Sequence, residues 1–260
     1  MSTLTDTLLN LLFPRRCPLC GSLTEESGTP QLCPQCREKL TRDLLALCPV
    51  CRRTAGDCQC FPDAVREAGD AIGGVPMRSL GFYRPETEPI SASLIYVLKQ
   101  QPDDTAARIL ARMLSMEAVR HFTRSGENIR EWTICYPPRS EPNRLRYGFD
   151  HGQRLARLMS KSCGAGYRPV FGRRGGDTQK SLSAADRREN TDTSLYLRDK
   201  NVSGGKFIIV DDIITTGATV ARCAALLKEA GARSVFIMSV LRTPYKKTYT
   251  KKDEPLWFAM

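Results

Sequence analysis

The chain has 260 residues, 41% of them hydrophobic, which is enough for one sizeable buried core with a small appended module. Its formal net charge of +11 favours anionic ligands such as nucleotides, pyrophosphate or nucleic acid. No apolar run approaches the ~20 residues of a membrane span, and residues 1–13 lack the positively charged start of a signal peptide. The composition therefore argues against a membrane-spanning protein and predicts a cytoplasmic one.

Eight cysteines occur before residue 61 as four closely spaced pairs. In a reducing compartment this density is typical of metal ligands rather than disulfides. Two such pairs complete a tetrahedral four-sulfur site with no open position, so we expect two structural zinc ions. Sequential pairing is the simplest arrangement, although the spacing also allows interleaved pairing. In sequential order the ligands are Cys17, Cys20, Cys33 and Cys36 for one site, and Cys48, Cys51, Cys58 and Cys60 for the other.

Composition divides the rest of the chain into further parts. A glycine-containing stretch after the cysteines predicts a linker into a larger domain. Apolar residues at helical spacing over 90–98, and again after Pro102, predict two helices near the start of that domain. The predicted boundaries are 1–62 for the cysteine module, 63–78 for the linker, 79–243 for the larger domain and 244–260 for a flexible basic tail.

A strand followed by a basic loop is predicted in the middle of the larger domain. Residues 132–136 have strand composition, and the two prolines after them end the strand. The loop that follows carries several arginines, whose planar guanidinium groups bind pyrophosphate oxygens in pairs of hydrogen bonds. Alone, such a sequence is typical of a solvated basic loop. Because an acid pair follows at 211–212, we interpret Arg139, Arg144 and Arg146 as ligands of a pyrophosphate group.

The segment 207–220 combines a strand, an acid pair and a hydroxyl-rich turn. Four apolar residues at 207–210 predict a strand buried on both faces, and helical spacing from Val220 predicts a helix after the turn. The turn offers free N–H groups at the positive end of the helix dipole, which suit a phosphate dianion. Asp211 and Asp212 only accept hydrogen bonds when ionised, so they suit a sugar cis-diol or Mg²⁺.

This segment closely resembles the phosphoribosyl pyrophosphate signature of type I phosphoribosyltransferases. The resemblance implies that Asp211 and Asp212 hold the ribose hydroxyls and that the turn wraps the 5′-phosphate. It also implies that Mg²⁺ accompanies the bound phosphoribosyl pyrophosphate. The turn residues assigned to this ligand are Thr215, Thr216, Gly217, Ala218 and Thr219.

Two further stretches resemble the ComF family of phosphoribosyltransferase-like proteins. Residues 146–151 resemble its Arg-Gly-Phe-Asn/Asp loop, although Tyr147 stands where the family usually has a second arginine. Residues 179–190 match its Gln, Leu-Ser, Arg and Asn positions, and in related transferases this region is a hood that closes over the substrate. The resemblance assigns Gln179, Arg187 and Asn190 to that hood.

Together these patterns predict an α/β fold, with a type I phosphoribosyltransferase-like parallel sheet, helices on both of its faces and a preceding zinc-ribbon module. The first functional hypothesis is a phosphoribosyltransferase that releases pyrophosphate, with Asp211, Asp212 and Arg146 as catalytic residues. The alternative is a non-catalytic adaptor that uses the phosphoribosyl pyrophosphate site as a sensor. The family resemblance implies a role in natural competence, so single-stranded DNA or competence-machinery proteins are the expected partners.

Overall fold

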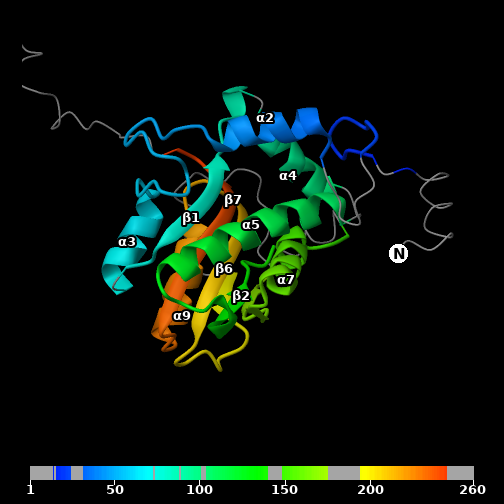
Figure 1. Ribbon diagram of the computed structural model, residues 1–260. Coiled ribbons are helices and arrows are strands. Elements are labelled where there is room, and N and C mark those ends of the chain that lie inside the picture. The colour runs from blue at the N-terminus through cyan, green and yellow to red at the C-terminus, as the bar shows by residue number, and fades with distance from the viewer. Residues whose placement is uncertain are drawn as a thin grey trace, which may run out of the picture.

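A five-stranded sheet forms the centre of the larger domain (Figure 1). Every neighbouring pair of its strands is parallel, in the order β1-β7-β6-β2-β3. The strands are β1 (Met77–Phe82), β2 (Trp132–Cys135), β3 (Gly166–Tyr167), β6 (Lys206–Ile214) and β7 (Ser234–Arg242). The computed structural model describes residues 14, 16–24, 32–72, 74–87, 89–100, 104–139, 148–174 and 194–244.

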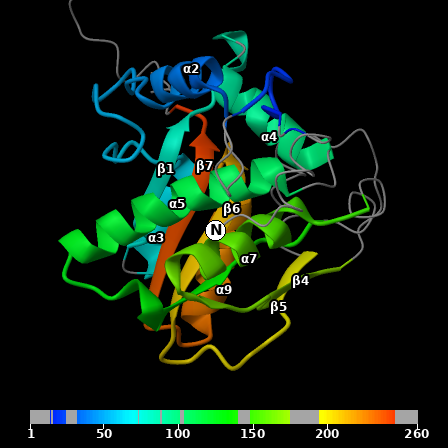
Figure 2. The ribbon, with the colours of Figure 1, turned by 45° about the vertical axis from the view of Figure 1, so that its right-hand side comes forward.

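Helices cover both faces of this sheet, as Figures 1 and 2 show. Ile208 packs with the helices of one face and the next residue, Ile209, with those of the other, and both side chains are fully buried. This alternation is what a strand buried on two sides requires, and it confirms the α/β prediction. One face carries α4 (Ile90–Gln100), α5 (Thr105–Arg124) and α7 (His151–Cys163), and the other carries α3 (Asp63–Ile72) and α9 (Ala218–Glu229).

The cysteine module lies at the carboxyl ends of β1 and β7, where α2 (Pro34–Leu44) crosses above the arrowheads in Figure 1. Gly81 near the end of β1 allows a close approach, because a Cβ atom there would lie 2.6 Å from the Leu44 Cδ2 atom. The neighbouring Phe82 is buried among Cys48, Ala55 and Cys58. The module therefore packs directly on the sheet, over its edge strand β1.

The segment predicted as a linker instead contains α3, and β1 begins at Met77, inside the predicted linker range. The glycines of this segment predicted an irregular connection, but the segment forms a helix because its apolar side is buried: Val65 is 1% exposed and α3 packs against α9.

A small antiparallel pair, β4 (Phe171–Arg173) with β5 (Leu195–Leu197), lies beside the main sheet. Among the described stretches, no helix is long and apolar enough to cross a lipid bilayer.

Candidate functional site

The acid pair lies inside strand β6 rather than after it. The sequence predicted the strand over 207–210, but pairing with β7 continues as far as Ile214 opposite Arg242. Side chains alternate along a strand, so neighbouring residues face opposite sides of the sheet. Asp212 accordingly contacts helices α4 and α7, whereas the charge of Asp211 acts on residues of the other face.

Asp212 is held by two basic side chains that the sequence did not bring together. Its Oδ2 atom lies 2.6 Å from the Nζ atom of Lys99, at the end of α4, and 2.9 Å from the Nε2 atom of His151, at the start of α7. Burial would raise the pKa of Asp212, but the contacts with His151 and Lys99 outweigh it and hold the pKa below its usual value. Asp212 is therefore ionised in the free protein and is already paired with the Lys99 ammonium group.

Asp211 has the opposite electrostatic environment. Burial raises its pKa well above the usual value, and the charge of neighbouring Asp212 adds to the effect. Its Oδ1 atom accepts a hydrogen bond from the Asp212 backbone N–H at 2.8 Å. A carboxylate whose charge is disfavoured in this way gains stability when a cation or a hydrogen-bond donor reaches it. Within the described residues, Asp212 thus has two close basic contacts, whereas Asp211 has none as close.

The turn after β6 forms a small pocket. Its volume is about 50 Å³, and Asp211 lines it together with the five turn residues at 215–219. Gly217, with φ = +80°, is the N-cap residue of α9 and offers no side-chain cap to the first N–H groups of the helix, of which that of Ala218 donates to Thr216 Oγ1 at 3.4 Å. Thr215 and Thr216 are exposed beside it. The pocket therefore combines hydrogen-bond donors with one carboxylate, the arrangement expected around a phosphorylated sugar.

The arginine loop reaches the same place through Arg139. Its Nη2 atom lies 3.3 Å from His151 Nε2, and its backbone N–H donates to Asp150 Oδ2 at 3.3 Å. Asp150 also caps α7 by accepting from the N–H groups of Gly152 and Gln153. The structure thus brings Arg139 close to Asp212 through His151. The other predicted pyrophosphate and hood residues, Arg144, Arg146, Gln179, Arg187 and Asn190, lie outside the described residues.

Sequence reasoning missed Lys99 and gave His151 no definite role. Lys99 directly follows Leu98, the last buried residue of α4, and a lysine at the end of a helix is expected to be solvated. His151 is 5% exposed and is the first residue of α7. Neither contact with Asp212 has a local signal, because each depends on how α4 and α7 pack on the sheet.

The eight cysteines form two clusters, and within each cluster the sulfur atoms all lie within 4.8 Å of one another. The clusters join consecutive cysteine pairs, so the sequential pairing is confirmed and the interleaved one is not found. Burial raises the pKa of Cys60 to about 12, so closely spaced thiolates at this position need a neighbouring cation. Four converging sulfurs fit a tetrahedral zinc ion, which would supply folding free energy to the module.

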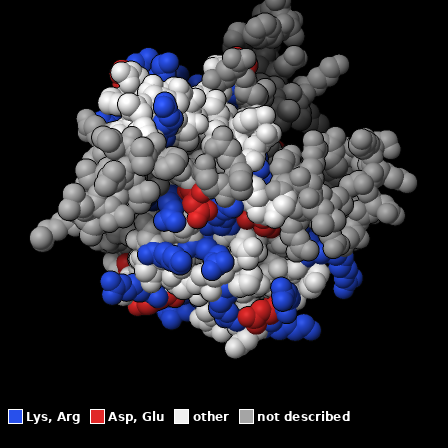
Figure 3. All heavy atoms as spheres, turned by 90° about the vertical axis from the view of Figure 1, so that its right-hand side faces the viewer, with Lys and Arg blue, Asp and Glu red and all other residues white. Residues whose placement is uncertain are grey.

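A basic surface adjoins the site along helix α7. Figure 3 shows lysine and arginine side chains gathered around a few acidic ones on this side of the molecule. A cavity of about 410 Å³ there is lined by Arg154, Arg157 and Lys161 of α7 and by Phe149 just before it, and also by Asp104, which pairs with Arg154 Nε at 3.0 Å. The guanidinium carbon of Arg154 lies 4.2 Å from the centre of the Phe149 ring. An aromatic ring within a cluster of cations is a common feature of single-strand nucleic-acid sites.

Comparisons with known proteins agree with both parts of the chain. The double zinc ribbon domain family matches residues 8–64, and the phosphoribosyl transferase domain family matches residues 154–259. The DNA utilization protein YhgH of Escherichia coli O6:H1 is 30% identical over 228 residues, which cover 82% of this chain and 98% of that protein. The competence protein ComFC of Streptococcus pneumoniae is 25% identical over 240 residues, or 87% of this chain and 100% of the relative.

Among solved structures, the glutamine phosphoribosylpyrophosphate amidotransferase of B. subtilis matches with a TM-score of 0.39 and 21% identity. That match covers 57% of this chain and 30% of the other.

Proposed function

This chain belongs to the ComF family, and on that premise we propose that it binds phosphoribosyl pyrophosphate with Mg²⁺ and transfers the phosphoribosyl group to an acceptor. In that reaction the bond from the ribose C1 atom to pyrophosphate breaks, and pyrophosphate leaves with the electron pair. The acceptor forms a new bond to C1 and loses its proton to solvent. The observation that carries the proposal is the junction of β6 and α9, where a carboxylate and a turn rich in N–H and O–H donors line one pocket.

Different residues of this junction would bind different parts of the ligand. The turn at 215–219 would hold the 5′-phosphate through backbone N–H groups and threonine hydroxyls. Asp211 and Asp212 would accept hydrogen bonds from the ribose hydroxyls. Arg139, next to His151, would face the pyrophosphate and stabilise its charge as it departs.

The Asp211 carboxylate, which lines the pocket, and the ligand phosphates offer the oxygen donors that Mg²⁺ prefers, so the residues present fit this ion. When bound, Mg²⁺ would neutralise charge on the pyrophosphate and make it a better leaving group. In the free protein the carboxylate of Asp212 is already paired with Lys99. Binding at Asp212 therefore has to displace Lys99 or share the carboxylate with it.

Isothermal titration calorimetry tests the binding step. Phosphoribosyl pyrophosphate with Mg²⁺ should bind the wild-type chain, and the double variant Asp211→Asn with Asp212→Asn should lose that binding. Asp199→Asn is the matched control, because Asp199 forms an ion pair with Arg168 outside the site. Unaltered affinity in the double variant would falsify the site assignment. Release of pyrophosphate across a panel of candidate acceptors then tests catalysis.

A second candidate function is an adaptor for single-stranded DNA that keeps the ligand site as a sensor. The basic surface around Phe149 and Arg154 favours it, as do the names of the relatives, a DNA utilization protein and a competence protein. Tight binding of phosphoribosyl pyrophosphate with no pyrophosphate release from any acceptor, together with salt-sensitive binding of oligonucleotides, would favour this function over catalysis.

A further inference from the structure

Arg242 joins the second cysteine cluster to the sheet. It is the last residue of β7, and its side chain is 0% exposed. Its Nη1 atom donates to the Cys60 carbonyl oxygen and its Nη2 atom to that of Cys58, both at 2.9 Å. Its guanidinium carbon also lies 5.2 Å from the Phe82 ring centre and 5.7 Å from that of Phe61. A buried cation with these partners fixes the backbone that carries two of the four sulfurs.

The backbone at Arg242 is equally fixed to the phosphate turn. Arg242 pairs with Ile214 in the sheet register, and the N–H of Thr243 donates to the Ile214 carbonyl oxygen at 2.8 Å. Ile214 is the residue immediately before the turn at 215–219. One buried side chain thus connects the sulfur ligands at 58 and 60 with the strand end from which the turn starts.

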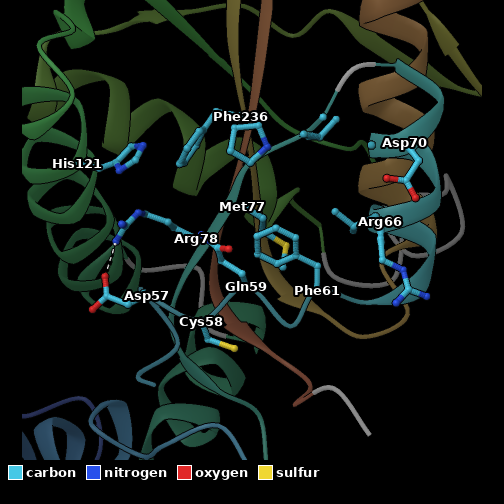
Figure 4. A pocket seen from close by; sticks show the side chains of 16 residues that line it. Asp57, Cys58, Gln59, Phe61, Arg66, Asp70, Met77, Arg78, His121 and Phe236 are labelled. Carbon is cyan, nitrogen blue, oxygen red and sulfur yellow. Dashed lines mark hydrogen bonds and ion pairs between the residues drawn. The ribbon is translucent and has the colours of Figure 1, made fainter. Parts of the chain in front are cut away.

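A second contact leads from the cluster to the turn. Directly after Cys60, the chain passes through Phe61 and into α3, and Figure 4 shows Cys58, Gln59 and Phe61 grouped beside Met77, with α3 on the right. Gly217 lies against the start of this helix, because a Cβ atom at 217 would be 2.6 Å from Val65 Cγ2 and 3.2 Å from Pro62 Cβ. Any shift of residues 58–65 would therefore move the wall against which the turn packs.

We propose that the second cysteine cluster and the phosphate turn are energetically coupled through Arg242 and the contact of Val65 with Gly217. A phosphate group that orders the turn stabilises the metal-bound cluster, and loss of metal from that cluster weakens phosphate binding by the same factor. Arg242 is a positioning residue in this scheme, since it touches neither the phosphate nor the metal. The proposal rests on the proposed function, because it needs the turn to bind a phosphate.

The first cluster provides an internal comparison. Cys17, Cys33 and Cys36 are buried in the core group of α2, α4 and α5, on the face of the sheet opposite Val65. No contact given by the described residues joins this cluster to the turn. The coupling therefore predicts an effect on one zinc ion and not on the other, which distinguishes it from a general stabilisation of the protein.

Site-resolved alkylation of the zinc-loaded full chain measures this difference. The protein is incubated with a chelator and iodoacetamide, and mass spectrometry follows the labelling rate of each cysteine, with ribose 5-phosphate or ribose present. Ribose 5-phosphate should slow the labelling of Cys48, Cys51, Cys58 and Cys60 by about fivefold or more, the lower end of usual coupling factors. The four cysteines of the first cluster should react at unchanged rates, and ribose should have no effect.

Variants of two arginines identify the route. Arg242→Met should abolish the selective protection, and Arg242→Lys, which keeps the charge but not the paired donors, should restore part of it. Arg84→Met is the matched control, because Arg84 donates to the Leu47 carbonyl oxygen beside the same cluster and has no contact with the turn. It should retain the full protection by ribose 5-phosphate.

The outcomes separate the two proposals. Calorimetric binding of ribose 5-phosphate with equal protection of both clusters, or with no protection, would overturn the coupling and leave the proposed function standing. A wild-type chain that binds no ribose 5-phosphate would overturn both. Because the decisive comparison uses the wild-type protein, it stands even if Arg242→Met fails to fold.

Discussion

The acid pair gives the sharpest prediction, because its two members should respond in opposite ways to the same substitution. Asp211→Asn removes a carboxylate whose charge is disfavoured by burial and by its neighbour. Asp212→Asn removes a carboxylate that is paired with Lys99 and His151. We therefore expect the first variant to be more stable than the wild type in the absence of ligand, and the second to be less stable. Both should lose affinity for phosphoribosyl pyrophosphate.

The expected magnitudes follow from these contacts. Asp212→Asn loses charge-assisted contacts at 2.6 and 2.9 Å, and a hydrogen bond to a charged group contributes about 1.5–3 kcal/mol. Asp211→Asn relieves an unfavourable buried charge, and single substitutions that relieve such a conflict commonly add about 0.5–2 kcal/mol. For a chain of this size each kcal/mol shifts the melting temperature by about 2–4 °C. The two variants should therefore melt on opposite sides of the wild type.

The pH dependence adds an independent check. The pKa of Asp212 is lowered in the folded state, so its contribution is present above the unfolded pKa of about 3.9 and is lost as the pH falls through the folded value. The pKa of Asp211 is raised, so wild-type stability falls as the pH rises from about 4 through the folded value. The advantage of Asp211→Asn should accordingly be small near pH 4 and grow towards neutrality.

Thermal and urea unfolding of the ligand-free proteins make the measurement, from pH 8 down to acid conditions below pH 4 where the Asp212 contribution is lost. Asp199→Asn serves as the control, since loss of its partly exposed ion pair with Arg168 should cost about 0–1 kcal/mol. Destabilisation by both site variants to the same extent would refute the assignment of opposite environments to the two carboxylates.

Three further predictions concern other parts of the molecule. Gly217→Ala should lower the affinity for ribose 5-phosphate, because alanine is strained at φ = +80° and its Cβ atom would meet Val65; unchanged binding by calorimetry would contradict this. Metal analysis should find about two zinc ions per chain, as two four-sulfur sites require, and one zinc ion would contradict the two-site structure. Replacing both Arg157 and Lys161 by alanine should reduce the slope of the logarithm of the oligonucleotide binding constant against the logarithm of the salt concentration by about 1.4, because each lost single-strand phosphate contact lowers that slope by ~0.7. Replacing exposed Arg37 on α2 should leave it unchanged, and equal effects would argue against the basic surface.

Much of this architecture has a local signal in the sequence. Paired cysteines predict the clusters, and an apolar run with two acids and a threonine-rich turn predicts the strand, turn and helix at 207–220. The end of β6 was misplaced because strand length depends on pairing with β7, which no local pattern shows. For a similar reason, the burial of Arg242 was not predicted. An arginine after an apolar strand is expected to be exposed to solvent. Arg242 is buried instead, because it donates to the carbonyl oxygen of Cys60, which lies 182 residues away in the sequence.

The position of the cysteine module over strand β1 affects the resistance of the protein to aggregation. An edge strand offers unpaired N–H and C=O groups to any other extended chain, and proteins avoid aggregation by covering or distorting such edges. Here Leu44 lies against Gly81, and Gly56 lies near the carbonyl oxygen of Ser79, so the module shields this edge. A chain shortened to the sheet domain would expose it. Metal depletion would then act as an aggregation trigger, and zinc would protect solubility as well as shape.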